Sequence, residues 1–377
     1  MSENNSFGVY VHFPWCLSAC PYCDFAFEVA RRGRGIPHAA YADAVLAELA
    51  ELTPKVAGRR LRSVYFGGGT PGLWAPAELA RALGAIVGAF PADAPLEVTV
   101  EVNPADETLQ HGRLDELRAA GVTRLSIGAQ SLDARLLRKL GRLHRAPDTA
   151  ATVAAARSAG IPRLSIDLML GVPGQSAGDA EADVDSVLAL APDHLSVYGL
   201  SVEAGTVFGR RAARGTLGAA KDDDLADRLL ATRKRLQAAG FEHYEISSYA
   251  RPGARSVHNE LYWTGGEWLG LGASAWSSRH QPGGGVERWR NDPTPAGYLA
   301  RPRDAVVTRE TLTPAEARRE AVWLGLRRLL DGVPHAAADA TISQPLLDQG
   351  LLEHGGLGLR LTERGFLLAD EVGRRFL

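Results

Sequence analysis

The alternation of two kinds of segment constrains the fold of this chain more than any other feature. Over the first 200 residues or so, short β-branched and apolar runs alternate with segments of helical period. A repeated strand-then-helix order predicts a parallel sheet, because parallel strands need long crossover connections. We therefore predict an α/β fold, a partial (β/α)6 TIM-like barrel, with an open doubly wound sheet as the alternative. The six predicted strands are residues 7–13, 61–69, 96–104, 124–131, 163–171 and 194–201.

The intervening segments carry the usual signals of amphipathic helices. Tyr41, Val45, Leu49 and Leu52 recur at helical spacing and would lie on one face. A second segment starts near Pro147 and stops at Gly160, the residue types that favour a helix start and a helix stop.

Each apolar run closes on small or polar residues, and a barrel brings such strand ends together. Taken alone, each of these residues is a normal turn or helix-capping residue. In a barrel, however, the carboxyl ends of all strands share one rim, which carries the chemistry. We therefore expect a ligand site at this rim, formed from Gly67–Gly69 with Thr70, Glu101 with Asn103, Gln130 with Ser131, Asp167, and Tyr198 with Gly199.

All three cysteines of the 377-residue chain, Cys16, Cys20 and Cys23, lie in one C-x3-C-x2-C loop directly after the first predicted strand. In a reducing compartment such clusters indicate metal or redox chemistry rather than disulfides. Three thiolates on a [4Fe–4S] cubane leave one iron without a protein ligand, open to a substrate or cofactor. A zinc or redox-sensing loop is the alternative, and His12 is a candidate fourth ligand.

Composition excludes several other classes of protein. Hydrophobic residues make up 45% of the chain and the net charge is -2, so we expect no nucleic-acid partner. We also expect no transmembrane segment, because no apolar run is long enough. The N-terminus lacks the pattern of a signal peptide. With clustered thiols, these features favour the cytoplasm; peripheral membrane contact and the oligomeric state stay open.

The chain is predicted to have three parts. Residues 1–240 form the barrel with the cysteine loop, residues 241–312 form a connecting segment that includes HNELYW, and residues 313–377 form a small helical, winged-helix-like module. A winged helix suggests nucleic-acid binding, and an RNA-modifying enzyme is one hypothesis. The module lacks a basic recognition helix, however, so we expect a lid or a partner surface.

Several motifs together carry a resemblance to a known family. The C-x3-C-x2-C loop with Tyr22 before its last cysteine resembles the radical S-adenosylmethionine (SAM) superfamily. The segments VYVHFPWC, CPYCDF, GGGTP, EVNP, GAQS, LGRLH, SIDLMLGVPGQ and HNELYW resemble its coproporphyrinogen III oxidase-like branch over nearly the whole chain. The resemblance implies a [4Fe–4S] cluster whose open iron binds SAM.

That branch includes an oxygen-independent coproporphyrinogen III dehydrogenase and the HemW-type haem chaperones. The dehydrogenase has a further cysteine two residues after the third, where this chain has Phe25. The chaperones have an H-N-x-x-Y-W motif, present here from His258 to Trp263. The resemblance therefore implies a chaperone that binds haem and transfers it to an acceptor protein, with the dehydrogenase as the alternative. Whether the chain is an enzyme stays open.

The resemblance also implies roles for individual residues. Cys16, Cys20 and Cys23 would bind the cluster, and His258 would bind haem. Cluster-bound SAM would contact Tyr10, Gly68 and Glu101. A second SAM, or a haem propionate in its place, would contact the remaining candidates, which are Tyr22, Gly69, Thr70, Gln130, Arg142, Asp167 and Gly199.

Overall fold

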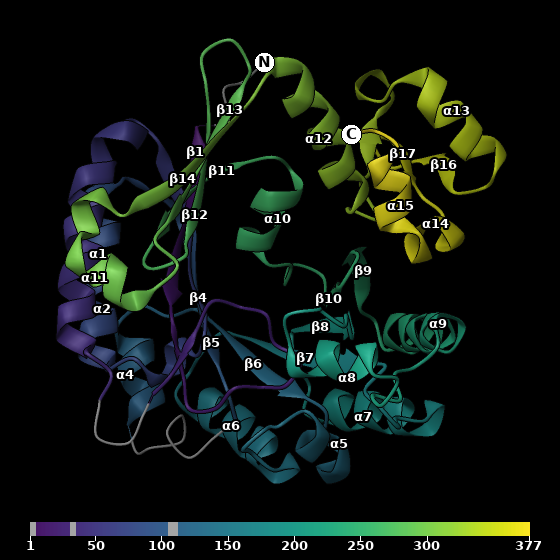
Figure 1. Ribbon diagram of the computed structural model, residues 1–377, viewed down its shortest axis with the longest axis horizontal. Coiled ribbons are helices and arrows are strands. Elements are labelled where there is room, and N and C mark those ends of the chain that lie inside the picture. The colour runs from purple at the N-terminus through teal and green to yellow at the C-terminus, as the bar shows by residue number, and fades with distance from the viewer. Residues whose placement is uncertain (1–4, 31–34, 105–111) are drawn as a thin grey trace.

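The computed structural model describes residues 5–30, 35–104 and 112–377, and its centre is a run of six parallel strands (Figure 1). Each strand lies beside the one that precedes it in this series, so the sheet curls in one direction. A doubly wound sheet would reverse direction part-way, and that alternative is wrong. The partial barrel is confirmed, with strands β1 (Ser6–Phe13), β4 (Arg60–Gly68), β5 (Ala92–Val102), β6 (Arg124–Gln130), β7 (Arg163–Leu170) and β8 (His194–Gly199).

Helices cover the outer face of this sheet. In α1 the four residues predicted to share a face, Tyr41, Val45, Leu49 and Leu52, are all buried, and α6 carries a proline in its first turn. These helices hold the barrel by apolar burial along one stripe. The helices of this layer are α1 (His38–Leu52), α2 (Pro76–Ala89), α4 (Arg113–Ala119), α5 (Ala134–Lys139), α6 (Ala146–Ser158), α7 (Ala177–Ala189) and α9 (Asp222–Ala238). Helix α8 (Val207–Ala213) packs instead against the cysteine loop, where the N–H of Phe208 donates to the carbonyl of Pro21.

The segment 241–312, expected as a connection, supplies strands at both edges of the same sheet. Beyond β8 it forms an antiparallel pair, β9 and β10, divided by a turn at residues 246–247. At the other edge, β11 pairs parallel with β1 and three antiparallel strands follow, leading through α11 (Pro295–Ala300). These strands are β9 (Glu242–Glu245), β10 (Ser248–Ala250), β11 (Glu267–Leu271), β12 (Trp276–His280), β13 (Val286–Asn291) and β14 (Val306–Leu312).

The C-terminal module has its own apolar core. It lies apart from the barrel in Figure 1, coloured yellow, and Leu229 and Leu230 of α9 pack against it. Its order of helix, strand, helix and two-stranded hairpin matches the winged-helix-like expectation. The elements are α12 (Pro314–Leu326), β15 (Val333–Pro334), α13 (Ala340–Asp348), β16 (Leu352–Gly355), β17 (Gly358–Leu361), α14 (Glu363–Leu367) and α15 (Ala369–Arg374). Domain boundaries at residues 240 and 312 stay a prediction.

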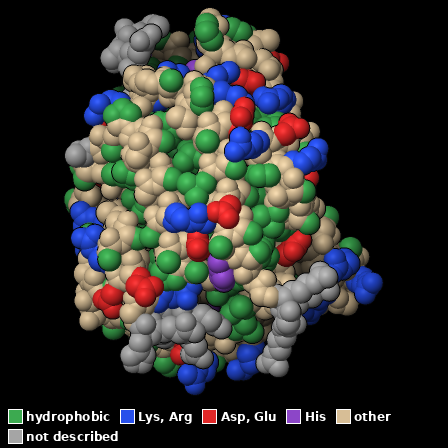
Figure 2. Space-filling view, turned by 90° about the vertical axis from the view of Figure 1, so that its left-hand side faces the viewer, with side chains coloured by type: hydrophobic (Ala, Val, Ile, Leu, Met, Phe, Trp, Pro, Cys, Tyr) green, Lys and Arg blue, Asp and Glu red, His purple; other side chains and the backbone are tan. Residues whose placement is uncertain are grey.

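The outer surface over α1 and α2 carries mixed charge. Figure 2 shows basic and acidic side chains interspersed on this face, and among the described residues neither sign forms a continuous patch there. Arg81 illustrates the pattern, because it pairs with both Asp43 and Glu78. Within the described ranges, every helix is too short or too polar to cross a bilayer.

Candidate functional site

The carboxyl ends of strands β4 to β8 and the cysteine loop, which follows β1, enclose a cavity of about 480 Å³. The strand ends meet because the strands are parallel and in sequential order. Of the fourteen residues to which the family resemblance assigns a role, twelve line this cavity; Tyr10 and His258 do not. Those that do are Cys16, Cys20, Tyr22, Cys23, Gly68, Gly69, Thr70, Glu101, Gln130, Arg142, Asp167 and Gly199.

The cysteine loop is tied to the end of β4 by backbone hydrogen bonds. The N–H of Gly69 donates to the carbonyl of Phe13 and the N–H of Thr70 donates to that of Trp15, each over 2.8 Å. The loop itself turns at Cys20, whose carbonyl accepts from the N–H of Cys23. A short parallel pair, β2 (Trp15–Cys16) and β3 (Glu28–Val29), closes its base. The three thiols are thus held on one wall of the cavity.

The thiols fit a cluster by their chemistry and surroundings. All three are free and half-buried. Burial raises the pKa of Cys23 to about 11 and also raises the pKa of Cys16, so binding of iron must displace these protons. Within the described ranges, no three His, Cys, Asp or Glu side chains lie close enough together to bind a single metal ion. A [4Fe–4S] cubane does not require such an arrangement, because each thiolate binds a different iron.

Arg142 places a cation beside the thiols. Its Nη1 lies 3.7 Å from the sulfur of Cys20, and its Nη2 donates to the carbonyl of Gly128 at 2.7 Å and to the side chain of Asn103. A guanidinium at this distance favours the thiolate form of a cysteine. Arg142 therefore faces the cluster loop as well as the cavity, which the sequence did not indicate.

Gly68 and Gly69 are required by close backbone approach. Gly68 has φ +110°, and a Cβ there would lie 2.6 Å from the ring of His12; a Cβ on Gly69 would lie 2.6 Å from the carbonyl oxygen of Trp15. Their N–H groups are already used, since that of Gly68 donates to Glu101 at 3.1 Å. The turn therefore does not offer these N–H groups to a ligand carboxylate. A ligand amino group is itself a hydrogen-bond donor, so it would not need the N–H groups of Gly68 and Gly69.

Two half-buried carboxyl groups, those of Glu101 and Asp167, line the cavity. Glu101 accepts hydrogen bonds from Tyr65 Oη at 2.7 Å and from Gly68, and burial raises its pKa to about 7. Burial likewise raises the pKa of Asp167 to about 6, and Ser126 donates to its carboxylate at 3.3 Å. A carboxyl group within an otherwise apolar strand needs a polar partner, and this serine supplies one. A cationic ligand would hold both groups ionised.

Gln130 offers a direct sign that the cavity fits a ligand. Its side-chain oxygen is buried and has no hydrogen-bond partner among the described residues, and its backbone has φ +66°. A buried acceptor without a donor costs roughly 1–3 kcal/mol, and a conformation of this kind is uncommon for a residue other than glycine. Both are typical of a position that a bound molecule completes.

Tyr10 and His258 lie inside the barrel wall rather than in the cavity. Tyr10 is half-buried and bonds His12 Nδ1 at 3.0 Å. His258 begins α10 (Val257–Trp263) and is only 1% exposed. Both nitrogens of its ring are engaged at 2.9 Å, one by Ser63 and one by Tyr262. Burial lowers the pKa of His258 to about 3, so the ring is neutral.

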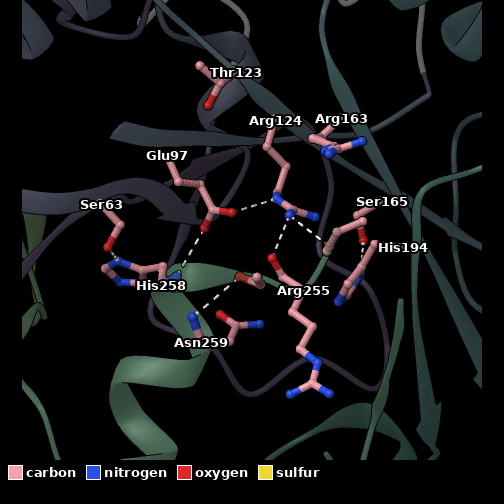
Figure 3. Close-up of polar contacts among 12 residues, drawn as sticks. Ser63, Glu97, Thr123, Arg124, Arg163, Ser165, His194, Arg255, His258 and Asn259 are labelled. Carbon is pink, nitrogen blue, oxygen red and sulfur yellow. Dashed lines mark hydrogen bonds and ion pairs between the residues drawn. The ribbon is translucent and has the colours of Figure 1, made fainter. Parts of the chain in front are cut away.

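A buried ion pair holds His258 in place (Figure 3). Glu97 accepts from the backbone N–H of His258 at 3.0 Å and from Arg124 Nε at 3.0 Å. Arg124 also donates to the carbonyls of Ala254 and Arg255, each over 2.9 Å. The start of α10 is therefore fixed to β5 and β6. No local pattern indicates this pair, because its two partners belong to different strands and lie apart along the chain.

Asn103, predicted from its place at a strand end, does line the cavity and donates to Thr70 Oγ1 at 2.9 Å. Sequence reasoning missed Tyr65, which donates its hydroxyl proton to Glu101. No pattern could have identified it, because a tyrosine within a strand is normally a packing residue.

Comparison with known proteins defines the class first. Residues 10–187 match the model of the radical SAM superfamily. A solved structure of coproporphyrinogen III oxidase (HemN) from Escherichia coli, described as a radical SAM enzyme, aligns with a TM-score of 0.81 at 25% identity, covering 98% of this chain and 90% of that one. The chain has the radical SAM fold, as the cysteine loop and the barrel predicted.

Relatives of known name narrow the family. The heme chaperone HemW of Mycobacterium tuberculosis is 39% identical, with 98% of this chain and 95% of that protein aligned. That of Escherichia coli is 33% identical over 98% and 97%. A mitochondrial radical S-adenosyl methionine domain-containing protein 1 of Bos taurus is 34% identical over 97% and 86%. The chain belongs to the HemW family of radical SAM proteins, as the HNELYW and CPYCDF segments indicated.

Proposed function

We propose that this protein is a cytoplasmic haem chaperone. It binds haem, holds a [4Fe–4S] cluster ligated by SAM, and transfers haem to an acceptor protein. The single observation that carries the proposal is the cavity in which three free thiols, Arg142 and two half-buried carboxyl groups converge. Similarity to heme chaperones along almost the full length of the chain supports it.

The chain's own residues would divide the work as follows. Cys16, Cys20 and Cys23 would hold the cluster, which when bound leaves one iron for the amino and carboxylate groups of SAM and can supply an electron to it. Glu101, with Tyr65 beside it, would accept from the SAM ammonium or ribose. Arg142 would stabilise thiolate charge.

The remaining residues of the cavity would bind a second group. Gln130, with its unpaired oxygen, would accept from a donor on that group. Asp167 would bind a cationic part of it, while burial excludes water. Tyr22, Gly69, Thr70 and Gly199 would form the surrounding wall. A second SAM or a haem propionate fits this description.

Coproporphyrinogen III decarboxylation is the second candidate, favoured by the similarity to the solved HemN structure. The position where the dehydrogenase carries a fourth cysteine is Phe25 here. Its side chain is 64% exposed at the mouth of the cavity, and a phenyl ring can neither bind iron nor transfer a proton. This substitution favours the chaperone.

The test uses the full chain, reconstituted anaerobically with iron and sulfide. Haem is added, with and without SAM, and the Soret band is followed; haem-free apomyoglobin then serves as a model acceptor. We expect haem binding, transfer to the acceptor, and no release of CO2 from coproporphyrinogen III. A variant with all three cysteines changed to serine is the control for the cluster. Turnover of coproporphyrinogen III, or failure to bind haem, would overturn the proposal.

A further inference from the structure

A second cavity of about 310 Å³ lies behind the cysteine loop. It is bounded by β1, α10, β11, β12 and the residues that follow the last cysteine. Gly68 and Phe25 line both this cavity and the cluster cavity. The two cavities are therefore adjacent, with Gly68 and Phe25 between them.

The walls of the second cavity are aromatic and fixed. Tyr262 and Trp268 meet edge to face with ring centroids 4.8 Å apart, and Trp268 Nε1 donates to the carbonyl of Trp276 at 2.8 Å. Trp276 and Phe25 complete the lining on the other sides. Large, immobilised rings around an open slot are suited to a flat, apolar ligand.

A guanidinium without a carboxylate partner stands at its edge. Arg290 on β13 donates to Ser274 Oγ at 2.8 Å, and Ser274 lines the cavity. No carboxylate of the described residues forms an ion pair with Arg290, and its buried Nε has no hydrogen-bond partner there. The other arginine on this strand, Arg288, is paired with Glu320. A half-buried cation of this kind favours an anionic group on the ligand.

An imidazole also faces this cavity. His12 lines it, and its Nε2 is bonded at 2.8 Å to the carbonyl of Ala26, in the segment that follows the cysteine loop. Movement of this segment would free Nε2, while the bond from Nδ1 to Tyr10 would keep the ring oriented. Both ring nitrogens of His258 are bonded too, but to Ser63 and Tyr262 and not to the segment that follows the cysteine loop. Its bond to Tyr262 instead fixes one aromatic wall.

We propose that the second cavity is the haem site: the aromatic walls hold an edge of the tetrapyrrole, Arg290 binds a propionate, and His12 Nε2 ligates the iron. This inference rests on the proposed function and says where the protein binds haem. His258 is then a positioning residue that acts through Tyr262. Because Phe25 and Gly68 belong to both cavities, occupancy of the cysteine loop also sets the shape of the haem site.

The experiment is a haem titration of the reconstituted full chain, followed by absorption and by electron paramagnetic resonance of the ferric iron. The variants are Arg290→Gln, Trp276→Leu, His12→Ala and His258→Ala. Arg309→Gln is the matched control, because Arg309 lies on the adjacent strand, is exposed and pairs with Glu287. Haem dimethyl ester, which lacks free propionates, is the second probe.

We expect Arg290→Gln to weaken haem binding about tenfold or more, as for a lost charge-assisted hydrogen bond, and to abolish the preference of the wild type for haem over its dimethyl ester. Trp276→Leu should also weaken binding, and Arg309→Gln should change it less than twofold. His12→Ala should alter the ligand signature of the iron, and His258→Ala should keep it.

Two results would overturn the inference in different ways. If the wild type binds haem but Arg290→Gln and Trp276→Leu bind it equally well, the haem site lies elsewhere and the chaperone function stands. If the signature of the iron depends on His258 and not on His12, the ligand assignment is wrong. If the wild type binds no haem, the proposed function itself fails. The arginine and tryptophan variants decide the location even where His12→Ala does not fold.

Discussion

The ion pair between Glu97 and Arg124 gives a sharp prediction for stability. The two side chains are 8% and 4% exposed, and Nε lies 3.0 Å from the carboxylate. Replacing Glu97 with leucine leaves a buried guanidinium without a carboxylate among the described residues and removes the acceptor of the His258 N–H. Loss of one partner of a buried pair costs about 3–5 kcal/mol, and the lost acceptor adds about 1 kcal/mol.

The double variant Glu97→Leu/Arg124→Leu is the matched control. It removes both charges, so the cost of burying an unpaired ion disappears and only the lost hydrogen bonds remain. We expect it to be more stable than Glu97→Leu alone by roughly 2 kcal/mol, since replacing both members of a buried pair is often near neutral. The two single variants should therefore couple strongly.

The assay is urea unfolding of the cluster-free chain, followed by far-ultraviolet circular dichroism and by tryptophan fluorescence. Coincident transitions would license a comparison of unfolding free energies. A loss below about 1 kcal/mol in Glu97→Leu would refute the reasoning, given the stated cost of an unpaired buried charge. Additive effects of the two single changes would refute it equally.

Two further predictions concern other parts of the molecule. Glu48 accepts hydrogen bonds from Tyr298 and Gly272, and burial raises its pKa to about 7. The folded state therefore binds this proton more tightly than the unfolded state, so the free energy of unfolding should fall as the pH rises from about 4.5 to 7. The Glu48→Gln variant should lose most of this pH dependence, which is worth roughly 3 kcal/mol. Urea unfolding midpoints at pH 5 and 8 measure it, and an unchanged pH dependence in the variant would show that Glu48 is not the group responsible. Gly68→Ala should lower stability by about 1–3 kcal/mol, because alanine is strained at positive φ and its Cβ would meet the His12 ring. It should also weaken SAM binding to the reconstituted chain, measured by equilibrium dialysis, whereas Gly84→Ala, where a Cβ meets open space, should do neither.

The sequence predicted the parallel barrel because its signals are local. Apolar runs, helical period and strand-end residues each lie within one segment, and parallel order then places the strand ends on one rim. Twelve of the site residues therefore line one cavity. The three cysteines needed no fold at all, since they share one loop.

What the sequence did not reveal depends on contacts between distant segments. The pairing of β11 with β1 joins residues about 260 positions apart, and no period or motif marks it. The hydrogen-bond partners of His258 could not be predicted for the same reason, because Ser63 and Glu97 come from other strands. A histidine beside tyrosine and tryptophan suggests a ligand from sequence alone, whereas its burial and its two occupied nitrogens are known only from the fold.

The edge pairing of the sheet has a consequence for biosynthesis. A single stretch, residues 248–271, pairs with β8 through its first residues and with β1 through its last. During translation the first six strands emerge with both borders of the sheet exposed, which invites pairing with other chains. The strand that leads into the cysteine loop gains its second neighbour only after residue 271 has left the ribosome. We expect nascent chains that stop before this stretch to aggregate, and iron to be inserted after translation has passed it.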